Sequence, residues 1–199
     1  MKGMPIAGDI PECPSLAPRL KPATLSLEDW NASIPERNNE AINRAERARS
    51  TEIGAECWRK SVSEIEAGWI SSPAPLTAHT AATVSLTPRY AIYEQHGNGP
   101  RKVRIIDDLK ASGVNSITTT KDTAVPDSLD TFLALTSYYL LIKPECELKA
   151  ASSDFCHAYK NVGIPPDDGG YSSVLLGPPS GPLLVSRLNA ALWQHQGPG

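Results

Sequence analysis

Two stretches of the chain carry side chains that suit chemistry on a phosphate group. Residues 153–160 read SDFCHAYK, in which Asp154 follows a segment that can form a strand. Residues 101–108 read RKVRIIDD, a local run of positive charge that leads into apolar residues. A carboxylate on rigid backbone is a suitable Mg²⁺ ligand, and the fork of a guanidinium group fits phosphate oxygens. Taken alone, an aspartate at a strand end is more often a cap or turn residue, so these two stretches do not assign a reaction by themselves.

The downstream stretch resembles the first catalytic motif of reverse transcriptases. In that family an Asp is followed, after three variable residues, by Ala and an aromatic residue, and Asp154, Ala158 and Tyr159 match this order. The resemblance implies that Asp154 binds the catalytic Mg²⁺, and that Tyr159 lies under the incoming sugar and rejects a 2′-hydroxyl. The alternative for Tyr159 is a half-buried aromatic side chain that only packs.

The upstream stretch resembles the fingers hairpin of the same family. That hairpin has Lys or Arg, a variable residue, Arg, a few apolar residues and Asp, with an Asn further on; Lys102, Arg104 and Asn115 match. The resemblance implies that Arg104 holds the triphosphate of a deoxynucleotide and that Lys102 is a second nucleotide-binding residue. A planar fork suits phosphate better than an ammonium group does. The structural alternative is a charged edge strand that discourages pairing with other chains.

The resemblance extends over roughly residues 86–190, and it implies a fold and a function. The implied fold is α+β, the fingers and partial palm of a polymerase, with an antiparallel sheet packed by helices. The implied function is that of a fragment of a retrotransposon reverse transcriptase, which adds deoxynucleotides to a primer 3′ end by a two-metal mechanism. Its cofactor would be Mg²⁺, and its partners a nucleic-acid template-primer and a deoxynucleoside triphosphate.

The later motifs of that family are missing from the sequence. There is no Leu-Pro-Phe-Gly-like motif and no Tyr-x-Asp-Asp hairpin. Asp167-Asp168 lies in a turn context, and Asp107 and Asp108 are strand neighbours whose side chains point to opposite faces, so neither pair is a substitute. One carboxylate cannot hold two metal ions, so we expect the chain to be inactive by itself. The alternatives are a non-catalytic, degenerate remnant and an α+β module that binds nucleic acid.

Composition limits the classes of partner. The chain has 199 residues, 40% of them hydrophobic, which is long enough for one core. Its net charge of −3 means that any contact with nucleic acid must be local. Four cysteines without paired spacing, and the lack of a secretory signal pattern, predict a reducing intracellular compartment. The longest apolar run is too short to span a bilayer, so no membrane anchor is expected. Protein partners stay unspecified.

The chain divides into three regions. Residues 1–32 contain five prolines among small residues, which predicts a disordered leader. Residues 33–85 form a helical segment and a loop, and the polar, proline-containing stretch over residues 71–88 predicts that loop. A capping-box spacing at Ser33 predicts the start of one long helix that reaches residue 67, although Gly54 is placed to divide it. Within this helix, spacings of four, three and four place four apolar residues on one packing face: Trp58, Val62, Ile65 and Trp69.

Residues 86–199 form the truncated fingers and palm. Apolar runs around glycine-rich turns predict two hairpins, residues 90–93 with 103–106 and residues 171–176 with 182–188. Between them the sequence predicts an irregular segment over residues 111–126 and a helix over residues 128–142, which Pro144 ends. A weakly alternating strand is expected over residues 147–154.

Overall fold

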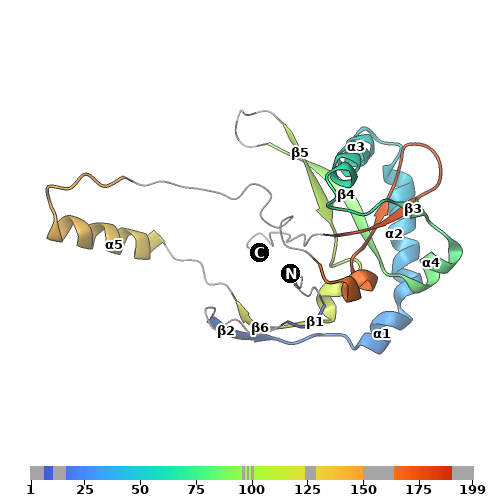
Figure 1. The fold of residues 1–199 in the computed structure, drawn as a ribbon, viewed down its shortest axis with the longest axis horizontal. Helices are drawn as coiled ribbons and strands as arrows, with labels where there is room; N and C mark the ends of the chain where they lie inside the picture. Colours follow the sequence, from blue (N-terminus) through green and yellow to red (C-terminus); the bar gives the residue numbers. More distant parts are fainter. Residues whose placement is uncertain are drawn as a thin grey trace.

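The computed structural model describes residues 7–10, 17–95, 97, 99, 101–123, 129–149 and 164–189. In these residues two sheets and several helices form a mixed fold, which confirms the α+β class (Figure 1). The helices are α1 (Leu27–Ala32), α2 (Ile34–Ala48), α3 (Glu52–Glu66), α4 (Ala78–Thr83) and α5 (Leu129–Ile142). None of the described helices combines the length and the apolar character that crossing a membrane requires.

The larger sheet has five strands and contains both predicted hairpins. Its order is β3 (Ala74–Pro75), β8 (Leu184–Arg187), β7 (Ser173–Leu176), β4 (Leu86–Glu94) and β5 (Lys102–Asp107). The β4–β5 and β7–β8 pairs are antiparallel, but β4 and β7 run parallel to each other. The sheet is therefore mixed rather than wholly antiparallel. Each hairpin follows from a local turn, whereas the pairing between hairpins joins strands that are far apart in the sequence.

Helices α2 and α3 cover opposite faces of this sheet. Successive strand residues point to opposite faces, so Leu175 packs with Ala41 of α2. Its neighbours Val174 and Leu176 pack instead against Trp58 and Ile65 of α3. All four residues of β7 are buried, as expected for a strand with both faces covered. The packing role predicted for Trp58 and Ile65 is confirmed.

The predicted long helix is two helices. It breaks at residues 49–51, where the Thr51 hydroxyl accepts a hydrogen bond of 3.1 Å from the backbone N–H of Gly54 and caps α3. Gly54 lies in the first turn of α3 rather than at the break. A Cβ atom there would lie 2.1 Å from the carbonyl oxygen of Ala48 at the end of α2. The glycine thus permits the close approach that lets consecutive helices reach opposite faces of the sheet.

Helix α2 begins where the sequence predicts a helix, but Ser33 does not cap it in the predicted way. Helix α2 begins at Ile34 with Pro35 in its first turn, yet the Ser33 side chain makes no cap hydrogen bond. Its hydroxyl donates instead to the carbonyl oxygens of Asp29 (2.9 Å) and Trp30 (3.1 Å) in α1. The capping box is therefore wrong, because the end of an unforeseen helix α1 supplies carbonyl groups that accept hydrogen bonds from the same hydroxyl.

Residues 17–32 differ from the predicted disordered leader. Strand β2 (Ala17–Lys21) pairs with β6 (Thr118–Thr123) in a second sheet that also contains β1 (Gly8–Asp9). Helix α1 follows, and its Trp30 is 3% exposed in a cluster with Ile34, Val114 and Ile117. The indole N–H of Trp30 donates to the carbonyl of Ser112. Pairing with β6 and the burial of Trp30 thus order a segment whose prolines argued against regular structure.

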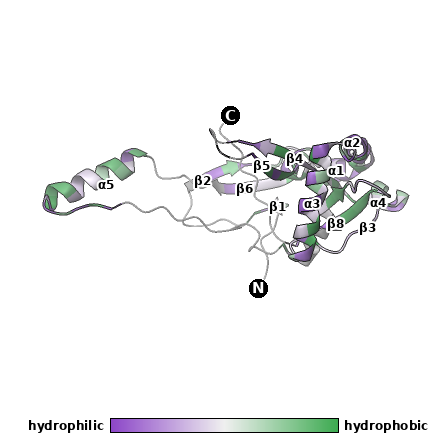
Figure 2. Ribbon diagram, turned by 90° about the horizontal axis from the view of Figure 1, so that it is seen from above, coloured by the Kyte–Doolittle hydropathy of each residue, from purple (hydrophilic) through white to green (hydrophobic). Residues whose placement is uncertain are grey.

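The remaining segments give mixed outcomes. The loop expected over residues 71–88 contains β3 and α4, and the segment expected to be irregular contains β6. Helix α5 is confirmed, but its apolar residues, among them Leu129, Phe132 and Leu141, are exposed. Figure 2 shows the hydropathy along this helix. Of the strand expected over residues 147–154, residues 147–149 are not in a strand, and residues 150–154 lie outside the described residues.

The close approach at Gly54 predicts the effect of replacing it. Alanine is favoured over glycine in helices by about 1 kcal/mol, so propensity alone predicts that Gly54→Ala stabilises the protein. We expect the opposite, a loss of about 1–3 kcal/mol in the free energy of unfolding, because the new Cβ atom meets backbone. Urea denaturation measures it, with Ala55→Gly at the exposed neighbouring position as the control for propensity. A Gly54→Ala variant with a higher free energy of unfolding than the unaltered protein would contradict the close contact between Gly54 and Ala48.

Candidate functional site

The basic residues singled out in the sequence lie together on the β4–β5 hairpin. Arg104 and Lys102 are two residues apart on β5, so their side chains leave the same face of the sheet, and both are exposed. The Arg104 side chain is 52% exposed and forms an ion pair of 2.8 Å with Glu94 of β4. Strand β5 is at the edge of the sheet, so a ligand in solution can reach these groups.

The other two predicted site residues, Asp154 and Tyr159, lie outside the described residues. Their approach to Arg104 therefore stays a prediction. Asn115, the third matching position of the upstream motif, is exposed in a 3₁₀ turn that follows the hairpin. Of the predicted site residues, the described structure therefore places Lys102 and Arg104 together, on one face of β5.

Asp107 and Asp108 point in different directions, as their strand positions predicted. Asp107 is buried beside Arg89 of β4. Asp108 instead accepts a hydrogen bond of 2.9 Å from the backbone N–H of Ala111 and lies 3.9 Å from a guanidinium nitrogen of Arg44 in α2. The two carboxylates are therefore engaged on different faces of the sheet, which agrees with their exclusion as a shared metal site.

A buried ion-pair network holds the base of the hairpin. Arg89 donates from Nε to Oδ1 of Asp107 (2.7 Å) and from a terminal nitrogen to Oδ2 (2.9 Å), a bidentate contact. Its other terminal nitrogen donates to Glu64 (2.8 Å) and to the hydroxyl of Ser61 (3.2 Å) on α3. The Arg89 side chain is only 1% exposed. The network thus joins α3 to both strands of the hairpin.

The charges of this network compensate one another. Burial lowers the pKa of Arg89, but the carboxylates of Asp107 and Glu64 raise it by more, so the net shift is upward. The guanidinium group therefore stays charged although it is buried. We call the set of Arg89, Asp107, Glu64 and Ser61 the Arg89 network.

Sequence reasoning missed the Arg89 network, although one signal was present. Arg89 and Asp107 are each nine residues from Asn98 in the predicted turn, so the two opposite charges sit at matching positions of the hairpin. In the structure they are direct cross-strand partners. Nothing in the sequence indicates that Glu64 of a distant helix joins them.

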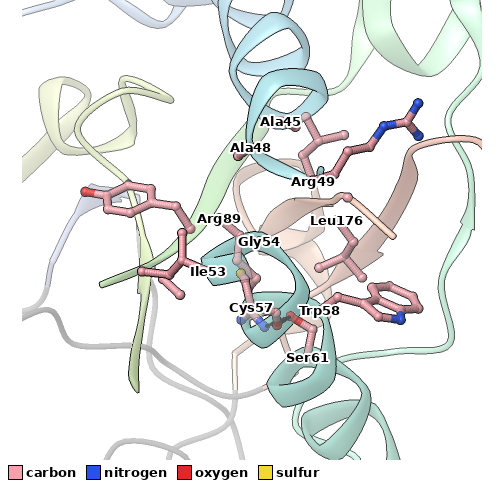
Figure 3. Close-up of a pocket in the computed structure, with 14 residues that line it drawn as sticks. Ala45, Ala48, Arg49, Ile53, Gly54, Cys57, Trp58, Ser61, Arg89 and Leu176 are labelled. Carbon is pink, nitrogen blue, oxygen red and sulfur yellow. Dashed lines mark hydrogen bonds between the residues drawn. The ribbon is translucent and has the colours of Figure 1, made fainter. Parts of the chain in front are cut away.

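A small pocket opens beside the network (Figure 3). It lies between the α2–α3 junction and the end of the β4–β7 pairing at Pro88. Its lining is mostly apolar and includes Ile53, Trp58 and Leu176, together with Cys57. Burial raises the pKa of the Cys57 thiol to about 11. The thiol is therefore protonated at neutral pH, which makes Cys57 a poor nucleophile.

Neither metal ligands nor relatives define the site further. Within the part of the chain that the structure describes, no group of three or more His, Cys, Asp or Glu residues is arranged to hold a metal ion. No protein-family model matches the chain, and no curated protein matches it. The chemistry of the candidate site is accordingly argued from the hairpin residues themselves.

The Arg89 network should dominate the stability of the hairpin. Arg89→Met leaves Asp107 and Glu64 buried without their cation, so we expect a loss of about 3–5 kcal/mol in the free energy of unfolding. Arg104→Met removes an exposed ion pair and should change this free energy by no more than about 1 kcal/mol. Urea denaturation compares the two variants. Equal losses in the free energy of unfolding would show that the buried network stabilises the protein no more than the exposed ion pair does.

Proposed function

We propose that the chain is the fingers and partial palm of a retroelement reverse transcriptase, and that its β4–β5 hairpin binds the phosphates of a deoxynucleoside triphosphate. One observation carries this proposal. Arg104 and Lys102 lie exposed on one face of an edge strand, and the Arg89 network anchors the base of that hairpin. An anchored pair of cations loses little freedom when an anion binds, which favours affinity.

The chemistry of the pair suits a polyphosphate. The Arg104 guanidinium offers two parallel N–H donors to one phosphate group, and the Lys102 ammonium adds a point charge nearby. The Arg104–Glu94 ion pair is exposed to water, so an incoming phosphate displaces the carboxylate at small energetic cost. The net charge of −3 gives no general attraction for anions, and the cations of the hairpin supply the local one.

Asp154 and Tyr159 complete the proposed site by their resemblance to the catalytic motif. Asp154 would bind Mg²⁺, which neutralises charge on the phosphates during transfer to a primer 3′-hydroxyl. Tyr159 would select the deoxyribose by its bulk. A template-primer duplex and a deoxynucleoside triphosphate are the partners that this function requires.

A structural role for the hairpin charges is the competing explanation. Strand β5 lies at the sheet edge, and exposed Lys and Arg side chains there oppose edge-to-edge aggregation. That role requires charge but no particular ligand. The nucleotide-binding role requires that phosphate affinity depends on Arg104 more than on other exposed arginines.

Arg59 provides the matched control for a binding experiment. Like Arg104, it is an exposed arginine paired with a nearby glutamate, Glu56, at 2.7 Å. We expect Arg104→Gln to weaken the binding of fluorescently labelled dATP with Mg²⁺ roughly tenfold, because a charge-assisted contact to phosphate is lost. Arg59→Gln should leave it unchanged. Fluorescence anisotropy measures both, and equal affinities for the two variants would refute a specific role for Arg104.

Primer extension tests the catalytic part of the proposal. We expect that the 199-residue chain, with Mg²⁺ or Mn²⁺ and an RNA template, extends no primer, because Asp154 alone cannot hold two metal ions. Asp154→Ala in the same preparation is the control. Extension that disappears in this variant would reveal a working polymerase and contradict the expected inactivity of the chain by itself.

A further inference from the structure

We propose that Arg101 and Tyr93 form a platform on which a base of single-stranded nucleic acid stacks. The pair lies on the hairpin that carries Lys102 and Arg104, but on its other face. The identity of that strand as a template rests on the proposed function. The stacking contact itself rests on the geometry of the hairpin.

The two residues already form a stack in the chain. The central guanidinium carbon of Arg101 lies 3.7 Å from the centre of the Tyr93 ring. Arg101 is exposed and Tyr93 is half-buried, so the guanidinium group lies over the ring at a position that solvent reaches. A planar cation held in this way offers a flat surface to a nucleobase. The ring fixes the guanidinium beforehand, so less freedom is lost on binding.

The strand register separates this stack from the phosphate-binding pair. Tyr93 pairs with Val103 across the hairpin, whereas Arg104 pairs with Ile92, so the Tyr93 and Arg104 side chains leave opposite faces. Arg101 directly precedes β5, and its contact with the Tyr93 ring places its guanidinium group on the face opposite to Arg104. A strand that passes over this edge can place phosphates against Lys102 and Arg104 and a base against Arg101.

The surroundings favour a single strand. Three cations lie within four residues, Arg101, Lys102 and Arg104, in a chain whose net charge is −3. Figure 1 shows the hairpin extending beyond the helices, and Arg101, Lys102 and Arg104 on it are all exposed. Grooves that combine basic side chains with stacking surfaces are typical of proteins that bind single strands, whereas a base inside a duplex has its faces covered by neighbours. A duplex is therefore a poorer fit to the Arg101–Tyr93 pair.

Arg101→Lys separates stacking from charge. Lysine keeps the positive charge but lacks the planar group, so it retains attraction to phosphate and loses the flat surface. The probes are a fluorescently labelled oligothymidylate of about 12 nucleotides, which suits a short binding site, and an abasic strand of equal length and charge. Anisotropy at fixed salt gives the affinity of each protein for each probe. Arg59→Lys, at an exposed arginine on α3, is the matched control.

We expect the unaltered chain to bind the oligothymidylate more tightly than the abasic strand. Arg101→Lys should weaken oligothymidylate binding roughly tenfold and leave abasic binding within about twofold, since one base stack is lost. Tyr93→Leu should lower the same preference, because the guanidinium group loses its support. Arg59→Lys should change neither affinity.

Three results would overturn the platform: no binding of oligothymidylate, no preference for it over the abasic strand, or an equal loss on both probes in Arg101→Lys. Labelled dATP with Mg²⁺, measured on the same proteins, distinguishes this failure from that of the proposed function. If dATP binding depends on Arg104 but not on Arg101, and the protein does not prefer oligothymidylate over the abasic strand, only the platform is rejected. If the protein prefers oligothymidylate over the abasic strand but its dATP binding does not depend on Arg104, only the nucleotide-binding role is rejected.

Discussion

The buried charge of Arg89 is the interaction on which the arrangement of the hairpin depends. A guanidinium group with 1% exposure is tolerated only where carboxylates replace its water, and these come from Asp107 on the partner strand and Glu64 on α3. Because the contact with Asp107 is bidentate, it favours one register of β4 against β5. A slip by one residue would move Asp107 to the other face and leave Arg89 without its partner.

The second constraint is that the sheet must be covered on both faces by consecutive helices. Strand β7 is buried throughout, so α2 must cover one of its faces and α3 the other. The chain must therefore change direction between the end of α2 and the start of α3. The missing side chain of Gly54 allows that crossing, and the Thr51 cap stops the two helices from merging. The Arg89 network and this crossing act on the same region, because α3 carries both Gly54 and Glu64. Hairpin register and helix placement therefore support each other.

These constraints divide the hairpin into a buried base and an exposed outer part with two different faces. Arg104 and Lys102 present charge on one face, and the Arg101–Tyr93 stack lies on the other. A phosphate contact needs charged donors that a ligand in solution can reach, whereas a stacking contact needs a flat group held in place. The strand alternation provides both within a few residues of one edge strand, and this is why the hairpin is the strongest candidate for contact with nucleotides.

Local patterns determined much of the secondary structure. The turn composition of both hairpins, the proline at the start of α2 and the apolar residues of α5 act within a few residues, so the sequence alone predicts these elements. The exposed placement of Lys102 and Arg104 also follows from alternation within one strand. By contrast, order in residues 17–32 depends on residues more than eighty positions away, because β2 pairs with β6 and Trp30 enters a cluster with Val114.

Only the tertiary structure decided which distant groups meet. The parallel pairing of β4 with β7, the approach of Gly54 to Ala48 and the entry of Glu64 into the Arg89 network all join separately formed elements. Charge and hydrophobicity along the chain do not encode these distances, because a helix packed on a sheet has many sterically similar positions. The sequence determined which residues offer charge, planarity and apolar surface. Packing decided that Asp107 and Glu64 compensate the buried charge of Arg89 and that Arg101 lies over the Tyr93 ring.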